Sequence, residues 1–311
     1  MHKATTDSRT QTPADSNIIL STNPESRGSS LPQDIYQNTP DYSGNSSVLG
    51  VDQYGKPGNN RACWGDYLRA EVDPRWSDLI LILCGFVSGL VDGLAFNAWG
   101  SFASMQTGNT VFVALGVSGQ PDYPAYLWAK SLISIATFVT GNIFFIHTSR
   151  FLGALRRSTL IASFALQTVA LFTAVLLVQT GVVEPKPEDP RAPIQWMQVV
   201  AIALLAFQAA GQIVASRVLA FDEIPTVVLT TLLCDLLVDP KLYASPWKAN
   251  PKRNRRVGAF LALFLGAMTA GGLVKVSGMS TALWVASALK ASITLCWFFW
   301  RERVVTTGCE V

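Results

Sequence analysis

Residues 85–116 read GFVSGLVDGLAFNAWGSFASMQTGNTVFVALG, and the order of apolar and polar residues in this stretch decides the fold. Its first half belongs to an apolar run, 79–99, that is long enough to cross a bilayer core about 30 Å thick as a helix. Its second half, 106–116, is also apolar but would reach only about half-way through a bilayer. Asp92 lies inside the first run, where a charge costs roughly 2.5–3.5 kcal/mol to insert. The stretch therefore predicts a membrane helix followed by a half-length segment.

The composition of the whole chain agrees with a membrane protein. Of its 311 residues 50% are apolar and 14% are charged, whereas soluble domains carry about 25% charged residues. The net charge of +3 and the uneven charge distribution exclude a basic nucleic-acid binder, a secreted disulfide scaffold and a coiled coil. Two histidines and five cysteines without a CxxC pair give no support to metal binding or histidine-based catalysis. We therefore expect no cofactor and no enzymatic activity.

The domain organisation follows from where the polar residues gather. Residues 1–60 are rich in Ser, Thr, Asn, Pro and Gly, and we predict that they form a disordered cytoplasmic tail. Residues 61–76 mix Trp and Tyr with Arg and predict an interfacial segment. The membrane domain should occupy residues 77–303, and residues 304–311 should form a second cytoplasmic tail.

Six apolar runs have the length and composition of membrane spans. They are residues 79–99, 125–147, 159–179, 194–216, 257–276 and 281–300. Aromatic residues mark several of their ends, as is typical of the membrane interface. The sequence therefore predicts an all-α membrane protein with six transmembrane helices.

The basic residues predict the orientation of these spans. They are concentrated before the first span, in alternate loops and after the last span: Arg61, Arg69, Arg75, Arg150, Arg156, Arg157, Arg217, Lys241, Lys248, Lys252, Arg253, Arg255, Arg256, Arg301 and Arg303. The other loops contain only Lys186, Arg191 and Lys275. The positive-inside rule then places both termini in the cytoplasm, and we favour the plasma membrane. The glycosylation sequon at Asn45 should accordingly be unused.

A second short apolar segment, 224–237, reads IPTVVLTTLLCDLL and lies between the fourth and fifth spans. Pro225 suits the first position of a helix, and Thr226 follows it. Thr107, Asn109 and Thr110 offer capping oxygens at the start of the first short segment. On length alone, both segments also fit interfacial helices or simple loops.

An internal repeat favours re-entrant half-helices over those alternatives. The first span contains DGLAF at 92–96, and the fourth ends with RVLAF at 217–221; a short segment follows each. Each half, 77–180 and 194–303, is thus a span, a short segment and two further spans. Because three crossings is an odd number, the two halves should be inverted relative to each other. Inverted repeats with interrupted helices are typical of transporters.

The free N-terminus of a half-helix presents unpaired N–H groups and the positive end of the helix dipole. Two such ends that face one cavity would favour a small anionic or polar solute. The candidate solute-binding residues are Thr107, Gly108, Asn109, Thr110, Thr226, Gln208 and Gln212.

The charges inside the spans are further candidates. Asp92 and Lys290 both lie within predicted spans, and a pair between them would serve either as structural glue or as part of an ion path. Arg217 lies near the end of its span, where its side chain can reach the interface. Small residues at 85, 89 and 93 and at 262, 266 and 270 predict close helix packing, within one chain or in a homo-oligomer.

The motifs in residues 85–116 resemble those of the uncharacterised YoaK-like family of multi-pass membrane proteins, found in bacteria and fungi. Its hallmark is similar to Gly85, Phe86 and Asp92 followed by Thr-Gly-Asn-Thr-Val at 107–111. In the second half, Gln208, Gly211, Gln212, Arg217 and PTVVLT at 225–230 also resemble it. The wording of 223–242 looks like the fungal branch, whereas bacterial members commonly have a Gln-Asn pair where this chain has Gly211-Gln212. The resemblance covers about residues 77–300 and implies no established activity.

Two functions fit these sequence features best. The first is a transporter or channel for a small polar or anionic solute. The alternative is a membrane scaffold or partner subunit that acts through its cytoplasmic tail. An intramembrane enzyme ranks last, because the sequence has no histidine cluster, no paired-carboxylate motif and no GxSxG signature.

Overall fold

A computed structural model describes residues 64–122, 125–185 and 193–303. In these ranges the chain is helical, with two isolated bridges, Glu71 to Arg156 and Val72 to Glu302, in place of any longer strand. The elements are α1 (Trp64–Arg69), α2 (Ser77–Trp99), α3 (Gln106–Val117), α4 (Leu127–Leu152), α5 (Arg157–Gln179), α6 (Met197–Val218), α7 (Thr230–Leu237), a short 3-10 helix (Trp247–Ala249) and α8 (Pro251–Phe298). The predicted tails and the sequon at Asn45 lie outside the described residues.

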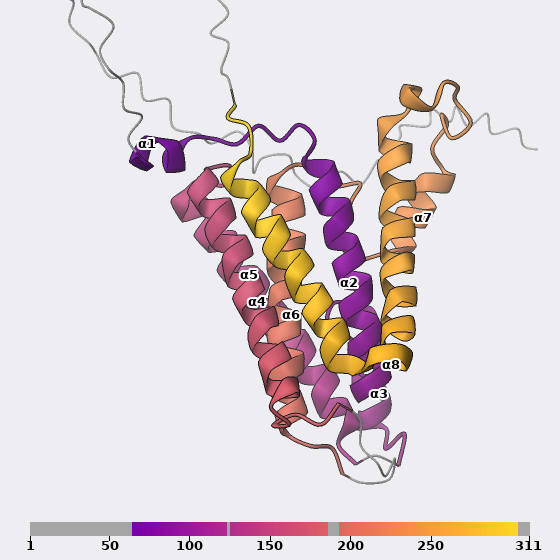
Figure 1. Cartoon of the computed structure of the whole chain (residues 1–311). Helices are drawn as coiled ribbons and strands as arrows, with labels where there is room; N and C mark the ends of the chain where they lie inside the picture. Colours follow the sequence, from indigo (N-terminus) through magenta and orange to yellow (C-terminus); the bar gives the residue numbers. More distant parts are fainter. Residues whose placement is uncertain (1–63, 123–124, 186–192, 304–311) are drawn as a thin grey trace, which may run out of the picture. The chain divides into compact units, whose positions relative to one another are not determined.

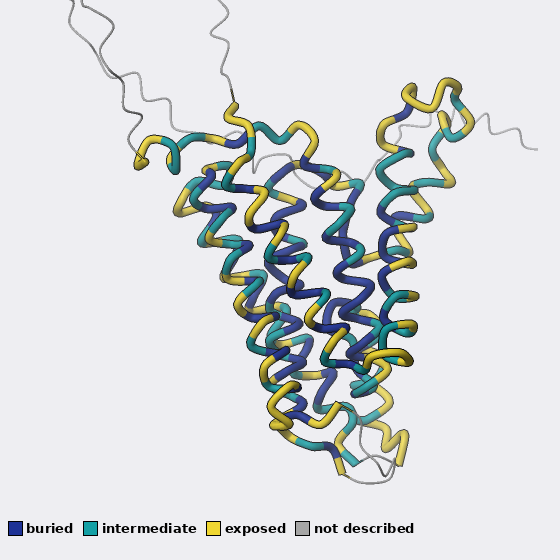
Figure 2. Tube along the Cα trace, viewed as in Figure 1, coloured by how far each residue is buried: buried dark blue, intermediate teal, exposed yellow. Residues whose placement is uncertain are grey.

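Five of the described helices, α2, α4, α5, α6 and α8, are long and apolar enough to cross a membrane. They run side by side as a bundle, and α2 and α6 are the most buried of them. Buried residues follow the inner faces, whereas exposed residues follow the outer faces (Figure 2). Large apolar side chains such as Leu261, Phe264 and Met268 on α8 are exposed. An outer surface of this kind suits contact with lipid, so the chain is an integral membrane protein.

The helix α8 combines two of the predicted spans, 257–276 and 281–300. Its 48 residues are interrupted at Gly278, whose φ of 84° and ψ of 170° are not helical. Such a positive φ strains any residue with a side chain, so glycine suits this position. Figure 1 shows that the two arms of α8, 251–277 and 279–298, run in opposite directions from this point. The loop expected between the fifth and sixth spans is therefore replaced by a break in one helix at Gly278.

The predicted stripes of small residues face each other where α2 packs on the first arm of α8. A Cβ at Gly89 would clash with the carbonyl oxygen of Leu263, and one at Gly266 would clash with that of Phe86. A Cβ at Gly93 would lie 2.9 Å from the Cβ of Ala270. The two backbones are thus in direct contact, as small residues permit. The packing expected from these stripes is formed within one chain.

After α2 the chain folds back along the bundle before it enters α3. The amides of Ala103 and Ser104 reach Asp92, which precedes the end of α2 by seven residues, or about 10 Å of helix. From there α3 runs back toward the end of the bundle beside α4: Asn109 contacts Ser134, and Gly116 packs on Trp128. The segment is therefore a half-length helix that begins part-way along the bundle, beside α4.

The second short segment begins differently from the prediction. Residues 219–229 are not helical, and α7 starts at Thr230 and not at Pro225. The chain turns twice here through unusual backbone conformations, with φ of 60° at Ala220 and 58° at Thr226. A residue with a left-handed conformation right after Pro225 prevents a helix from starting there. The buried residues 224–227 form a compact turn, and α7 then packs on α8.

The predicted interfacial segment contains the short helix α1 and an extended stretch, residues 70–74, which we call the strap. The strap joins the end of α8 and the α4–α5 turn through hydrogen bonds from Asp73 N to Arg301 O and from Val72 N to Leu155 O. Beneath it Arg157 is buried, stacks on Tyr67, and donates to the carbonyl oxygens of Tyr67 and Trp300. One guanidinium group therefore ties three separate chain segments together.

Candidate functional site

Asp92 fastens the chain where it folds back between α2 and α3. Its Oδ1 accepts hydrogen bonds of 2.8 Å from the amides of Ala103 and Ser104, and its Oδ2 accepts from the Ser104 hydroxyl. The predicted ion pair with Lys290 is wrong, because Asp92 has these three donors and Lys290 bonds to Gln212 instead. Three donors on one carboxylate offset the cost of its burial.

Asn109 is the second anchor of the chain that folds back between α2 and α3. Its Oδ1 accepts from Phe102 N at 3.0 Å and Ser101 Oγ at 3.1 Å. Its Nδ2 donates to the Phe102 carbonyl at 2.8 Å and to Ser134 Oγ at 3.0 Å. Asn109 is fully buried, so the amide joins residues 101–102 to α4 and does not cap the helix. The predicted capping role is wrong because its side chain lies beyond the first turn and turns toward α4.

Of the other candidate residues on α3, Thr107 and Thr110 lie on its exposed side, and Gly108 packs against Phe102. Thr107 is exposed, and Thr110 is exposed with its hydroxyl donating to the Gln106 carbonyl. At Gly108 an added Cβ would lie 2.9 Å from the ring of Phe102, so that ring requires a glycine here. The structure therefore brings Asp92 and Asn109 to one place and leaves Thr107 and Thr110 outside it.

Other buried polar residues lie in the core of the bundle, and we call Lys290, Gln212, Gln208, Gln167 and Ser88 the central layer. The fully buried ammonium of Lys290 donates to Gln212 Oε1 over 2.6 Å. Gln212 Nε2 in turn donates to Ser88 Oγ at 2.7 Å and to the Cys84 carbonyl at 2.9 Å. The Gln212 amide thus accepts a hydrogen bond from the second arm of α8 and donates hydrogen bonds to α2.

Two other amides of the central layer have hydrogen-bonding capacity left. Gln208 is 1% exposed, yet neither its Oε1 nor its Nε2 has a partner among the described residues. It precedes Gln212 by four residues and therefore shares its face of α6. Gln167 is fully buried and its Oε1 is likewise unpartnered. Buried polar groups are usually satisfied, so these atoms mark a place that could bind a polar solute.

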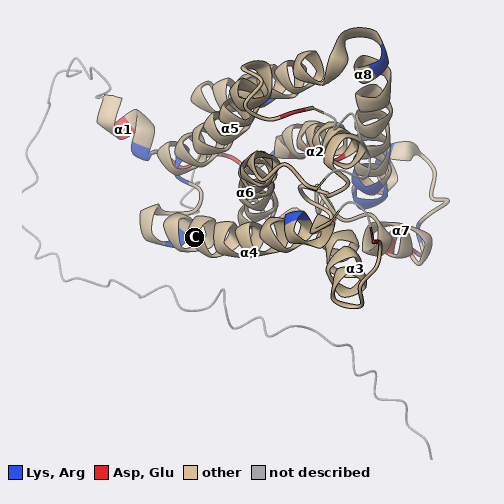
Figure 3. Ribbon diagram, turned by 90° about the horizontal axis from the view of Figure 1, so that it is seen from below, with Lys and Arg blue, Asp and Glu red and all other residues tan. Residues whose placement is uncertain are grey.

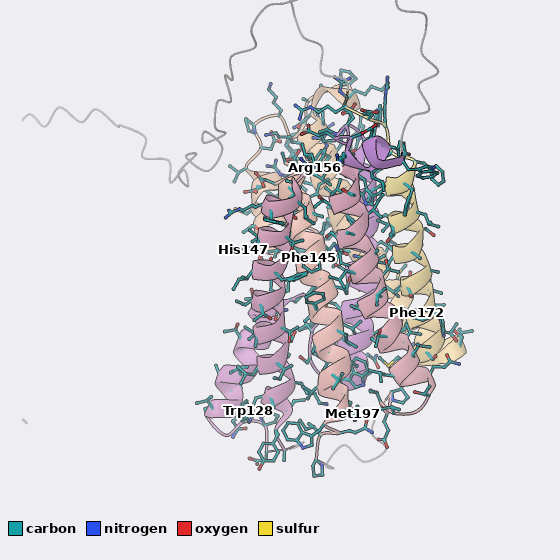
Figure 4. All side chains as sticks on the ribbon, turned by 90° about the vertical axis from the view of Figure 1, so that its left-hand side faces the viewer. Trp128, Phe145, His147, Arg156, Phe172 and Met197 are labelled. Carbon is teal, nitrogen blue, oxygen red and sulfur yellow. The ribbon has the colours of Figure 1, made fainter. Side chains whose placement is uncertain are left out.

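The close contacts of Gly211 on α6 explain how Gln167 of α5 reaches the central layer. A Cβ there would lie 2.7 Å from the Phe145 ring and 2.8 Å from Gln167 Cδ. Figure 4 shows Phe145 on α4, between Trp128 near one end of the bundle and Arg156 near the other. The glycine lets the α5 amide approach α6 closely.

The remaining predicted residues lie at the end of the bundle near α7. Thr226 is buried, and its hydroxyl has no partner among the described residues. Arg217 is partly exposed and bonds to Asp222 at 2.8 Å, which agrees with a side chain that reaches the interface. Neither residue has a described contact with the central layer.

The long helices contain few charged residues, as Figure 3 shows in a view along the bundle. Lys290 is the positive charge of the central layer, and Asp92, one turn from Ser88 on α2, has its own donors. Within residues 64–122, 125–185 and 193–303, no group of three or more His, Cys, Asp or Glu could hold a metal ion. The chemistry available in the layer is therefore hydrogen bonding around one cation.

The motif residues Asp92 and Asn109 and the central layer all lie within residues 80–296, which match the family described as "Protein of unknown function (DUF1275)". The chain belongs to this family. The match confirms the resemblance drawn from the Asp92 and Thr-Gly-Asn-Thr-Val motifs, and the assignment to the fungal branch stays a prediction. No curated protein and no solved structure matches the chain.

Within this DUF1275 domain, sequence reasoning missed Ser88 and Gln167 of the central layer and Ser134 beside Asn109. Gln167 had a usable signal, because an amide in the middle of an apolar span is unusual. Serine gives no such signal, because it is common at helix contacts in membranes.

Proposed function

We propose that this DUF1275 protein is a membrane transporter or channel for a small anionic solute, which binds at the central layer. The observation that carries the proposal is Lys290, a fully buried cation in the bundle core with an amide oxygen as its hydrogen-bond acceptor. An ionisable residue at such a depth indicates a functional site unless it is paired with an opposite charge.

The donors of the central layer suit a carboxylate or a similar anion. An ammonium has three N–H donors, and Gln212 accepts from one of them. A solute oxygen could accept from Lys290, and Gln208 Nε2 could donate to the same solute. Charge-assisted hydrogen bonds of this kind are about twice as strong as neutral ones.

The packing of the helices supports two inverted halves. Helix α2 of the first half packs on the first arm of α8 in the second half, and α6 of the second half packs on α4 in the first half. Within each half, the short helix packs on the helix that follows it or the next one: α3 on α4 and α7 on α8. If α8 is counted as two spans, each half is span, short helix, span and span. Halves related in this way can rock against each other around a central site.

The proposed orientation has both termini in the cytoplasm. The bundle end near α1 and α7 contains most of the described basic residues outside the helices. The Gly278 end contains two lysines, both on helices: Lys275 on α8 and the buried Lys130 on α4. This asymmetry supports the positive-inside arrangement.

The test is flux in proteoliposomes. Purified protein is reconstituted, and uptake of a panel of small carboxylates, inorganic anions and neutral polar solutes is measured. Lys290→Met keeps a long unbranched side chain and removes the charge, and should reduce anion uptake about tenfold or more. Lys275→Met, which removes an exposed lysine near the Gly278 break, is the matched control and should transport like wild type.

Two results would contradict the proposal. One is uptake by wild type no faster than by protein-free vesicles for every solute in the panel. The other is equal uptake by wild type and the folded Lys290→Met variant.

A further inference from the structure

A hollow at the α1 end of the bundle is unrelated to the central layer. Its volume is about 770 Å³, within the range of small-molecule sites. Three arginines line it, together with two carboxylates and an apolar floor: Asp73, Pro74, Arg75, Leu155, Val218, Leu219, Ala220, Arg301, Glu302 and Arg303. Guanidinium groups thus outnumber carboxylates around it.

The strap holds these arginines in place. Asp73 N donates to the Arg301 carbonyl, and Arg303 N donates to the Glu71 carbonyl. The backbones of Arg301 and Arg303 are therefore fixed beside the hollow, whereas the side chains of all three arginines are exposed.

The charges on these arginines are only weakly compensated. Arg75 lies 3.9 Å from Asp73, and Arg303 lies 3.5 Å from Glu71, and both arginine side chains are at least half exposed. Exposed ion pairs of this geometry contribute little, about 0–1 kcal/mol. The Arg301 side chain has no hydrogen bond or ion pair with the residues that the structure describes. Its guanidinium group is therefore available to a ligand.

We propose that this hollow binds a phosphate group, through Arg75, Arg301 and Arg303. Guanidinium forks match phosphate oxygens two at a time, and the lining has one more guanidinium group than carboxylates, which favours an anion. The floor made by Leu155, Val218 and Leu219 would contact the apolar part of a ligand. The source of the phosphate is either a lipid headgroup from the adjacent leaflet or a soluble phosphate, and both have the same chemistry.

The experiment compares three proteins with two phosphate probes. Wild type, Arg301→Gln with Arg303→Gln, and the control Arg150→Gln are purified; Arg150 is an exposed arginine outside the hollow. Inorganic phosphate is titrated against detergent-solubilised protein by thermophoresis. Retention of phosphatidylinositol phosphate is measured by native mass spectrometry after reconstitution into phosphatidylcholine nanodiscs that contain a minor fraction of it. If the double variant unfolds, Arg301→Gln alone is used, because its side chain makes no described contact.

Wild type and Arg150→Gln should bind at least one probe, and the double variant should bind it about tenfold more weakly. Binding of the lipid alone assigns the phosphate to a headgroup, and binding of inorganic phosphate as well assigns it to a soluble ligand. The proposal is overturned if wild type binds neither probe, or if the three proteins bind equally. Because flux is not the readout, failure here leaves the proposed transport function standing.

Discussion

At the scale of single residues, Asp92 and Asn109 hold one structure together. Both are part of the motif that identifies the family, and both bond to residues 101–104 and not to an open cavity. Their shared task is to hold the chain in its folded-back path before α3. A buried carboxylate is suited to this because its two oxygens accept from several backbone amides at once.

Asp92→Ala should therefore release residues 101–104, where the chain folds back between α2 and α3. The amides of Ala103 and Ser104 would remain buried without an acceptor, which should lower the free energy of unfolding by about 3 kcal/mol. Asp92→Asn keeps one acceptor oxygen and should lose about 1 kcal/mol. Chemical unfolding in detergent micelles measures the loss, and hydrogen exchange over residues 101–109 locates it. Unchanged exchange in Asp92→Ala would show that the carboxylate does not hold this segment.

Residue types alone predicted part of this site. The half-length segment was visible because 106–116 is apolar but too short to span, and Asp92 because a charge within a span is rare. The partner of Asp92 was not visible, because it depends on the chain folding back about 10 Å along α2. The contact of Lys290 with Gln212 was missed for a similar reason, because it depends on the register between α6 and the second arm of α8.

At the scale of elements, two contacts organise the bundle: the close crossing of α2 with α8 and the loop that leads into α8. The stripes of small residues predicted the α2–α8 crossing. The break at Gly278 was not predicted, because a loop of ordinary length was expected there. The loop that leads into α8 is held by Arg253, a buried residue near the start of α8. Its guanidinium donates to the carbonyl oxygens of Leu242, Ala244 and Trp247.

The α2–α8 crossing predicts opposite outcomes for two glycines of one helix. Gly266→Ala should lower the free energy of unfolding by about 3 kcal/mol, because its Cβ would overlap the Phe86 carbonyl. Gly271→Ala has open space around the new Cβ and should be neutral or stabilise the helix by up to about 1 kcal/mol. Thermal unfolding of both variants in the same detergent is the measurement. Equal losses would mean that helix propensity, and not backbone contact, sets the effect.

The loop before α8 should loosen in acid. Its Asp239 accepts from Asn250 Nδ2 at 2.9 Å and from Lys241 N at 2.9 Å, and these bonds, that from Asn250 above all, hold the pKa of its carboxyl below the usual value. A lowered pKa stabilises the fold at pH values above the ordinary pKa of aspartate, about 3.9. This stabilisation is lost as the pH falls through the pKa that Asp239 has in the folded protein.

Hydrogen exchange over residues 238–250 should therefore speed up on acidification in wild type. In Asp239→Asn, which cannot titrate at this position, the exchange corrected for its intrinsic pH dependence should change less. The same acid response in both proteins would assign the effect to another group.

At the scale of the whole membrane domain, α2 packs on α8 and α4 packs on α6, and the proposed transport would pass through the central layer. Transport requires that this layer meet water on each side in turn, because a solute must enter from one side and leave on the other. Gln208 is the best position to detect this, since both atoms of its buried amide are unpartnered among the described residues.

The most direct measurement is the accessibility of a cysteine at position 208. The five native cysteines are replaced by alanine, Gln208→Cys is introduced, and the protein is reconstituted in vesicles. A membrane-impermeant thiol reagent is then applied from either side, with Leu261→Cys, on the exposed apolar face of α8, as the control that should stay unlabelled. We expect position 208 to be labelled from both sides, and more slowly when the transported anion is present. Labelling from one side only, or from neither, would contradict transport through the central layer.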